Sequence, residues 1–242
     1  MMKEVCIYHI AEQFLFEYYC QPGEYRICEE DHAGELLSKG LSQEKRGGLM
    51  GALQSYEKAL AFNPVSTQIY FRLISVHFRL GQLEELFSRT KEVYPYLSTK
   101  AEMAQYYRWL GYYYLEKYQP ELSAALYRYS TLFSKSAQAE EEIRYLEAAM
   151  DRKLADDSQR ELQEKLQKAG IPVTASNVTL ALLYRAGQEA LQHAKDAAGK
   201  NETATAKHWR QQALDCFSMI YDLTEDAQIK EEMEALSRMD LS

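Results

Sequence analysis

The sequence has few of the residues that turn or break a chain. Its 242 residues include only 11 Gly and 5 Pro. So few turn residues favour long, uninterrupted helices over a sheet protein with many short strands. With 46% hydrophobic and 26% charged residues, the composition is typical of a globular protein and excludes a disordered or collagen-like chain.

Long apolar runs and a surplus of positive charge are also missing. No stretch approaches the roughly 18 to 20 apolar residues of a membrane span, and residues 1–20 lack the pattern of a signal peptide. The formal net charge of −8 argues against binding to nucleic acid or to an anionic membrane, because phosphate contacts need Lys and Arg. The four cysteines show no CxxC spacing, so we expect free thiols and a cytoplasmic location.

Residues that could support catalysis are not grouped in the sequence. The five histidines are scattered, without the HExxH spacing of a zinc site, and there is no glycine-rich phosphate loop. Residues 29–32 (Glu-Glu-Asp-His) resemble a metal-binding tract, but acidic residues at a helix start also favour the helix dipole. We therefore predict no enzymatic activity, no catalytic residue, no metal site and no cofactor.

Three segments share one spacing of small and large residues. A small residue or its substitute precedes another by twelve residues in the pairs Gly40 and Ala52, Ile74 and Leu86, and Gly111 and Ser123. An aromatic residue or its substitute follows four residues later, at Tyr56, Thr90 and Tyr127. Positions three and four apart share one helix face, so small residues there allow two helices to approach closely.

With this spacing, the segments resemble tetratricopeptide repeats, which are helix-turn-helix units of 34 residues. The resemblance places three repeats at 33–66, 67–100 and 104–137. The second keeps the turn glycine, Gly81, whereas the third has Tyr118-Gln119-Pro120 instead. The resemblance implies an all-α fold: a right-handed α-α superhelix, or solenoid, of antiparallel helix pairs with helical extensions at both ends.

Both ends of the chain depart from the repeat pattern, although we expect residues 1–242 to form a single helical-repeat domain. Residues 1–30 are expected to cap the first repeat, with a buried helix over 3–20 or, alternatively, a short strand at its start. The C-terminal region, 138–242, is predicted to be helical. It would contain one or two amphipathic helices over 138–168, a divergent repeat near 176–222 with longer helices or a loop around 199–205, and a capping helix over 225–239.

In this family the first helices of successive repeats line a concave groove, so the resemblance nominates outward faces in 67–80 and 104–117. The candidate peptide-binding residues there are Gln68, Phe71, Arg72, Ser75, Phe78, Arg79, Gln105, Arg108, Trp109, Tyr112 and Leu115. Residues 67–137 contain 9 bases and 6 acids, a surplus that favours an acidic peptide. Alternatively, this aromatic stripe is core, and His77 is expected to be a core histidine.

Two functions follow from this pattern. The first is a non-enzymatic protein-protein interaction module that binds an acidic peptide or partner segment in the groove. The alternative is a self-assembling structural protein that forms a homodimer through helices at 138–168 and 204–239. Groove binding predicts that Arg72, Arg108 and Trp109 are accessible together, whereas self-assembly predicts a contiguous apolar patch on the C-terminal helices.

Overall fold

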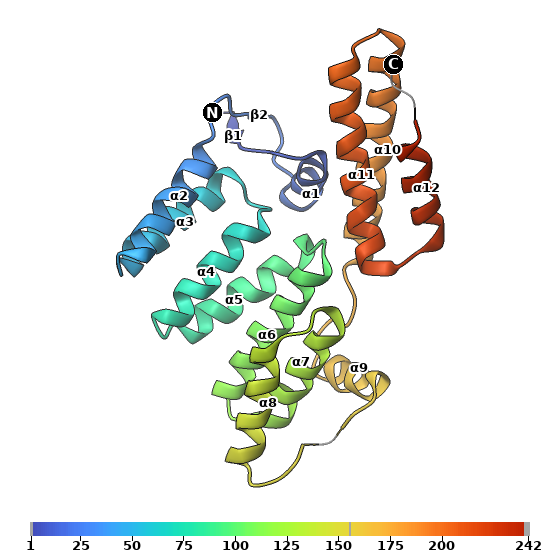
Figure 1. The fold of residues 1–242 in the computed structure, drawn as a ribbon. Helices are drawn as coiled ribbons and strands as arrows, with labels where there is room; N and C mark the ends of the chain where they lie inside the picture. The colour runs from blue at the N-terminus through green and yellow to red at the C-terminus, as the bar shows by residue number, and fades with distance from the viewer. Residues whose placement is uncertain (1, 155, 240–242) are drawn as a thin grey trace. The chain divides into compact units, whose positions relative to one another are not determined.

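The structure is a computed structural model that describes residues 2–154 and 156–239. Within this part of the chain, twelve α-helices and two three-residue strands are present, which confirms the predicted all-α helical-repeat fold (Figure 1). The chain forms two compact units, Met1–Ser66 with Ser176–Ser242, and Thr67–Ala175. The handedness of the superhelix and the repeat boundaries stay predictions.

The N-terminal part of the first unit combines a small sheet with three helices. Its elements are β1 (Lys3–Val5), α1 (Ile10–Cys20), β2 (Tyr25–Ile27), α2 (His32–Lys45) and α3 (Leu49–Phe62). The strands pair in parallel, with Val5 opposite Ile27. A helix over all of 3–20 is therefore wrong: the chain stays extended through Val5, the Cys6 N–H donates to the Phe62 carbonyl at 2.9 Å, and the His9 side chain caps a helix that begins at Ile10.

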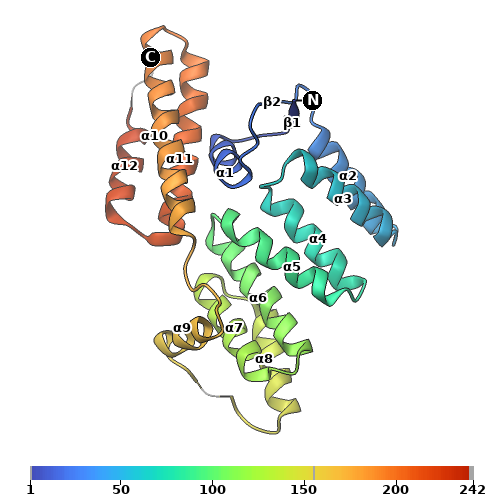
Figure 2. The ribbon, with the colours of Figure 1, turned by 180° about the vertical axis from the view of Figure 1, so that it is seen from behind.

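The C-terminal part of the first unit is a group of three helices. These are α10 (Asn177–Gly199), α11 (Thr203–Thr224) and α12 (Ala227–Ser237), which lie side by side (Figure 2). Only residues 200–202 separate α10 from α11, so the extra length of the divergent pair lies in longer helices rather than in a loop. The shared core with α1 includes Ile10, Leu183, Phe217, Ile220 and Leu236.

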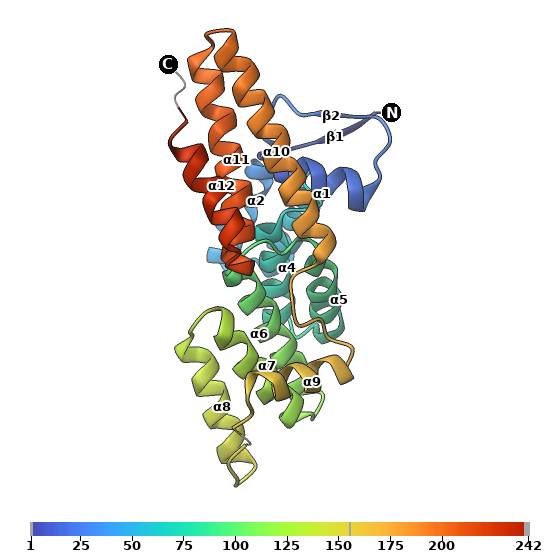
Figure 3. The same ribbon diagram turned by 90° about the vertical axis from the view of Figure 1, so that its right-hand side faces the viewer.

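The second unit contains six α-helices and one 3-10 turn. They are α4 (Thr67–Arg79), α5 (Leu83–Val93), η1 (Tyr94–Tyr96), α6 (Lys100–Glu116), α7 (Pro120–Phe133), α8 (Ala137–Ala149) and α9 (Gln159–Lys168). The region 138–168 thus holds two helices, and α7 lies between them (Figure 3). None of the described helices of the chain is long and apolar enough to cross a membrane.

Three helix pairs approach each other at a glycine that faces an aromatic ring. A methyl group at Gly40 would overlap the ring of Tyr56, and one at Gly111 would lie 3.1 Å from the ring of Tyr127. At Gly187, the distance to the ring of Phe217 would be 2.9 Å. The spacing that carried the family resemblance therefore marks the points of closest packing between α2 and α3 and between α6 and α7, whereas the α10–α11 contact joins residues 30 positions apart.

In the α4–α5 pair the larger residue lies on the first helix and the smaller one on the second, the reverse of the glycine–aromatic pairs. Ile74 stands at the glycine position and Thr90 at the aromatic position, and both side chains are fully buried. The Thr90 hydroxyl donates to the Leu86 carbonyl at 2.7 Å, so its polar atom is satisfied inside the core. A larger residue on α4 thus accompanies a smaller one on α5, which explains how this pair departs from the family pattern without losing its packing.

The turn between the paired helices requires a left-handed residue at one position. Gly47 has φ +78°, Gly81 has φ +69° and Tyr118 has φ +56°. These three residues occupy the same place in the proposed 34-residue units. Glycine adopts this conformation without steric cost, whereas a residue with a Cβ atom pays about 1–2 kcal/mol.

Three tyrosines fix the extended segment that follows α9. The hydroxyls of Tyr107, Tyr129 and Tyr94 donate to the carbonyls of Pro172, Val173 and Thr174 at 2.9, 2.6 and 2.9 Å. These carbonyls are consecutive along the chain, and an extended segment cannot satisfy them by itself. The tyrosines therefore hold this segment against η1, α6 and α7.

We predict that Gly187→Ala lowers the free energy of unfolding by about 1–2 kcal/mol, because the added methyl group overpacks the contact with Phe217. Gly199, at the end of the same helix, is the matched control. Nothing lies within 4 Å of a methyl group there, so Gly199→Ala should be neutral or stabilise by up to about 1 kcal/mol. Urea unfolding measures both, and equal stabilities would contradict the close approach.

Replacing Tyr118 by glycine should stabilise the protein by about 0.5–1 kcal/mol, since the side chain is 93% exposed and its removal costs no packing. The complementary variant, Gly81→Ala, places a Cβ atom at φ +69° and should destabilise by about 1 kcal/mol. Chemical denaturation of both variants tests this pair, provided that their m values equal that of the unmodified protein. Opposite signs are expected, and a loss of stability in Tyr118→Gly would contradict the strain at this turn.

Candidate functional site

Helix α6 presents one face to the core and another to an open groove. It begins with a capping box in which Thr99 and Glu102 satisfy each other's backbone N–H groups. Its core face includes Tyr106, Leu110 and Gly111. The residues at helical spacing on the opposite side of α6 line the groove.

The groove has a volume of about 600 Å³ and lies within the second unit. Four helices, α4, α6, α7 and α8, contribute its lining. The lining residues are Phe78, Ala101, Gln105, Arg108, Trp109, Tyr112, Leu115, Glu116, Tyr127 and Glu142. A cavity of this size, with a largely aromatic wall and few charged groups, has the composition of a ligand-binding site.

Three aromatic rings form a contiguous wall of the groove. The ring of Phe78 lies 4.8 Å from that of Tyr112 in an edge-to-face arrangement at 81°, and 5.6 Å from that of Trp109. Phe78 is nevertheless 42% exposed. Large rings that are held by their neighbours and still reach solvent offer rigid contact area at a low cost in conformational entropy.

The charged groups in the groove have both signs. Arg108 lies at the middle of α6, and its Nε donates to the Ala104 carbonyl at 3.0 Å. Burial lowers the pKa of the Arg108 guanidinium. Glu116 and Glu142 are the carboxylates of the lining, and burial, followed by the charge of Glu141, raises the pKa of Glu142.

Two tyrosines complete this polar pattern. Burial, with a smaller effect from the adjacent Glu116 carboxylate, raises the pKa of Tyr112. Burial also raises the pKa of Tyr127, to which the charge of Glu142 adds. Both phenols therefore remain neutral and can donate or accept hydrogen bonds inside the groove.

The predicted residues of α6 come together in this groove, whereas most of those on α4 do not. Gln105, Arg108, Trp109, Tyr112 and Leu115 all line it, and from α4 only Phe78 does. The α4 residues outside the lining are Gln68, Phe71, Arg72, Ser75 and Arg79. Of these, Phe71 is buried as core, Ser75 is half-buried, and Gln68, Arg72 and Arg79 are exposed.

The accessibility test for the groove gives a divided result. Arg72 is exposed and Arg108 and Trp109 are half-buried, so none of the three is lost in the core, but Arg72 is not part of the groove. His77 is buried, as expected for a core histidine, with its Nδ1 2.8 Å from Gln82 Oε1. Its Nε2 is buried without a hydrogen-bond partner among the described residues.

The sequence interpretation missed four lining residues. Ala101 lies four residues before Gln105, and Glu116 four residues after Tyr112, so helical spacing alone could have extended the face to them. Tyr127 was identified only as a packing residue, and Glu142 only as part of the amphipathic helices predicted over 138–168. As a result, the positive surplus of 67–137 is not reproduced in the lining, where one arginine stands with two glutamates.

Comparison with known proteins gives only distant structural similarities. No family model matches the sequence, and no curated protein matches it. The chain is similar to YrrB, described as a TPR protein with an unusual peptide-binding site, at 15% identity and a TM-score of 0.42, over 86% of this chain and 94% of that chain. It is also similar to a TPR repeats protein from Bacteroides fragilis, at 14% identity and a TM-score of 0.36, over 87% of this chain and 100% of that chain.

Proposed function

We propose that the protein is a non-enzymatic interaction module whose groove along α6 binds a peptide or a segment of a partner protein. The observation that carries the proposal is the half-open aromatic wall of Phe78, Trp109 and Tyr112 around a volume of about 600 Å³. Such a wall fits one or two apolar side chains of a partner. The three proposed 34-residue repeats would serve as the scaffold that presents it.

The charges along α6 suggest how the partner is oriented. Arg108 and Glu116 are eight residues apart on one helix, which is about 12 Å at 1.5 Å per residue. An extended peptide covers this distance in about four residues at 3.3 Å each. We infer that the partner places an acidic side chain near Arg108 and a basic one near Glu116 and Glu142, with apolar residues between them.

Acidic character would then apply to one end of the partner rather than to all of it. The exposed Arg72 and Arg79 of α4 stand outside the lining and contribute no contact inside the groove. A uniformly acidic peptide would meet Glu116 and Glu142, where like charges repel. The proposed ligand is therefore a segment of mixed charge.

Self-assembly through the C-terminal helices has less support. The apolar residues of α10, α11 and α12 pack into the core of their own unit, together with α1. Among the described residues of 138–239, which include both predicted interface segments, the exposed large apolar residues are Tyr145 in the second unit and Val178 and Tyr184 in the first. Three separate side chains do not form the contiguous patch that a stable homodimer requires.

The groove can be tested with its own tryptophan. The chain has two tryptophans, so Trp209→Phe leaves Trp109 as the single reporter of the groove. We expect peptides with Asp and Lys about four residues apart and Leu or Phe between them to shift Trp109 emission on binding. A peptide with the same residues in scrambled order is the control, and the absence of a shift with every such peptide would contradict groove binding.

Variants then separate the contribution of each side chain, with a labelled peptide and fluorescence polarisation as the readout. Trp109→Ala should weaken binding about ten-fold or more, since a central aromatic contact contributes more than 1 kcal/mol. Tyr145→Ala removes an exposed aromatic residue of α8 outside the lining and should leave the affinity unchanged. Arg108→Gln should weaken only peptides that carry the acid, and an equal loss for peptides without it would contradict the inferred orientation.

A further inference from the structure

The small parallel sheet of the first unit brings together residues that are distant in sequence. Glu4 lies opposite Arg26 and Val5 opposite Ile27, so the next pair in this register is Cys6 and Cys28. The Cys28 N–H donates to the Val5 carbonyl at 2.8 Å, which holds the two segments of the chain together beyond the strands. After Cys28, three residues lead directly to His32 at the start of α2.

This register produces a cluster of side chains with metal-binding atoms. Ligand atoms of Glu4, Cys28 and His32 lie within 4.8 Å of one another, and all three side chains are half-buried. The buried thiol of Cys6 lies outside this group of three, interacts with the thiol of Cys28 and donates to the Glu30 carbonyl at 3.9 Å. Glu4 lies in β1, Cys28 directly follows β2 and His32 begins α2, so the three donors converge from three segments, and Cys6, which directly follows β1, lies next to them.

The spacing of these atoms is close to that of a tetrahedral zinc site. Bonds of about 2.0–2.3 Å at tetrahedral angles separate ligand atoms by roughly 3.3–3.8 Å. For Glu4, Cys28 and His32 the observed limit of 4.8 Å exceeds this by about 1 Å, which rotations of side chains can close, and the Cys6 thiol, outside that group, has to rotate further. A cavity of about 250 Å³, lined among others by Glu4, Cys28 and His32, gives an ion access to the donors.

The surroundings of the cluster support a bound cation rather than a chance grouping. Cys6 Sγ accepts from the Ala33 N–H at 3.4 Å and donates to the Glu30 carbonyl at 3.9 Å, and the first of these contacts would also stabilise the thiolate that a metal requires. The ring of His32 packs against Phe62 at 5.1 Å, which restricts its orientation. Asp31 is occupied as the N-cap of α2, where it accepts from the Gly34 N–H at 2.8 Å, and His32 Nε2 lies 4.0 Å from a carboxylate oxygen of Glu30, a contact that a bound ion would replace.

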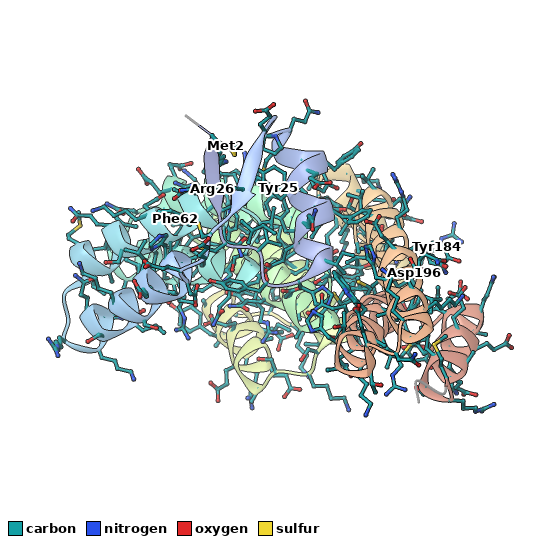
Figure 4. The ribbon with its side chains drawn as sticks, turned by 90° about the horizontal axis from the view of Figure 1, so that it is seen from above. Met2, Tyr25, Arg26, Phe62, Tyr184 and Asp196 are labelled. Atoms are coloured by element: carbon teal, nitrogen blue, oxygen red, sulfur yellow. The ribbon has the colours of Figure 1, made fainter. Side chains whose placement is uncertain are left out.

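Arg26 balances the charge of the site. It pairs with Glu4 on the face of the sheet where Met2 and Phe62 also lie (Figure 4). Two thiolates, one carboxylate and a neutral imidazole around a divalent ion leave one negative charge, which the guanidinium compensates. A ligating carboxylate that also pairs with a second group is a common arrangement around zinc.

We propose that Glu4, Cys6, Cys28 and His32 bind one zinc ion that joins β1, β2 and α2. Sulfur and nitrogen donors select zinc over magnesium and calcium, which prefer oxygen. Four protein ligands leave no open position, so the ion is structural and fixes the N-terminal segment to α2. The site lies in the first unit and the groove in the second, so it is independent of the proposed peptide binding.

The test uses the whole protein, reduced with a phosphine and freed of metal by a chelator. We expect it to take up one Zn²⁺ per chain, measured by mass spectrometry of the metal after dialysis. With Co²⁺ as the probe, thiolate-to-metal charge transfer and the intense visible bands of tetrahedral cobalt are expected. Uptake below one ion per chain, or a cobalt spectrum without thiolate bands, would overturn the proposal.

Alkylation of the cysteines gives a second readout that needs no variant. Zinc should slow the alkylation of Cys6 and Cys28 and leave that of Cys20 and Cys216 unchanged, as read by peptide mass spectrometry. Equal protection of all four thiols, or of none, contradicts the assignment. If the isolated protein contains a Cys6–Cys28 disulfide and takes up no zinc after that disulfide is reduced, the assignment is contradicted as well.

Variants identify the individual ligands. Cys28→Ser and His32→Ala should each weaken zinc binding about 100-fold or more, whereas Arg26→Gln, outside the ligand set, should weaken it about ten-fold at most. Cys216→Ser and His193→Ala are the matched controls elsewhere in the chain and should bind zinc as the unmodified protein does. Wild-type affinity in Cys28→Ser would exclude this site.

Discussion

At Gly111, the backbone of α6 lies against the ring of Tyr127 on α7, and any side chain there would enter the space that the ring occupies. The same contact joins Gly40 to Tyr56 and Gly187 to Phe217. Burial of one large ring against bare backbone brings two helices close enough to exclude water along their length. The close approach of the two helices determines where the first must end and which side of each is buried. The short left-handed turns and the alternation of core and exposed faces follow from it.

The same contact also builds the groove. Tyr127 packs on Gly111 and at the same time forms part of the groove lining, so the ring that holds α6 and α7 together is also a wall of the candidate site. The Ser123 hydroxyl donates to the Gly111 carbonyl at 2.8 Å, one turn before Tyr127, and fixes the register of the two helices. The rigidity of the site is therefore that of the helix pair, and the aromatic wall needs no partner to be organised.

The helix pairs could be predicted because their packing residues are close in sequence. A spacing of twelve and then four residues specifies a turn and a facing helix, and the structure places a close contact at each marked pair that keeps its glycine. The groove face of α6 followed from helical spacing for the same reason. The orientation of α4 about its own axis could not be predicted in this way. Phe71 and Phe78 are equally apolar, and only tertiary packing decides that the first is core and the second lines the groove.

Contacts between distant segments were beyond the reach of the sequence pattern. Three-residue strands carry almost no periodic signal, and the pairing of β1 with β2 depends on a register between residues 22 positions apart. The proximity of Glu4 and Cys6 to Cys28 and His32 exists only once that register is set. Sequence inspection could find the tract 29–32, but not that β1 lies beside it and brings Glu4 and Cys6 close to Cys28 and His32.

The charge of the groove depends on the least regular part of the second unit. Helix α8 packs on α7 through Ala139 and Leu146, and this contact brings Glu142 into the groove beside Tyr127. The helix pairs supply the aromatic wall and Arg108, whereas the helix that follows them supplies one of the two carboxylates. In the proposed binding mode, apolar affinity and charge selectivity therefore arise from different elements, so a change in α8 would alter which partner is preferred without disturbing the packing that forms the wall.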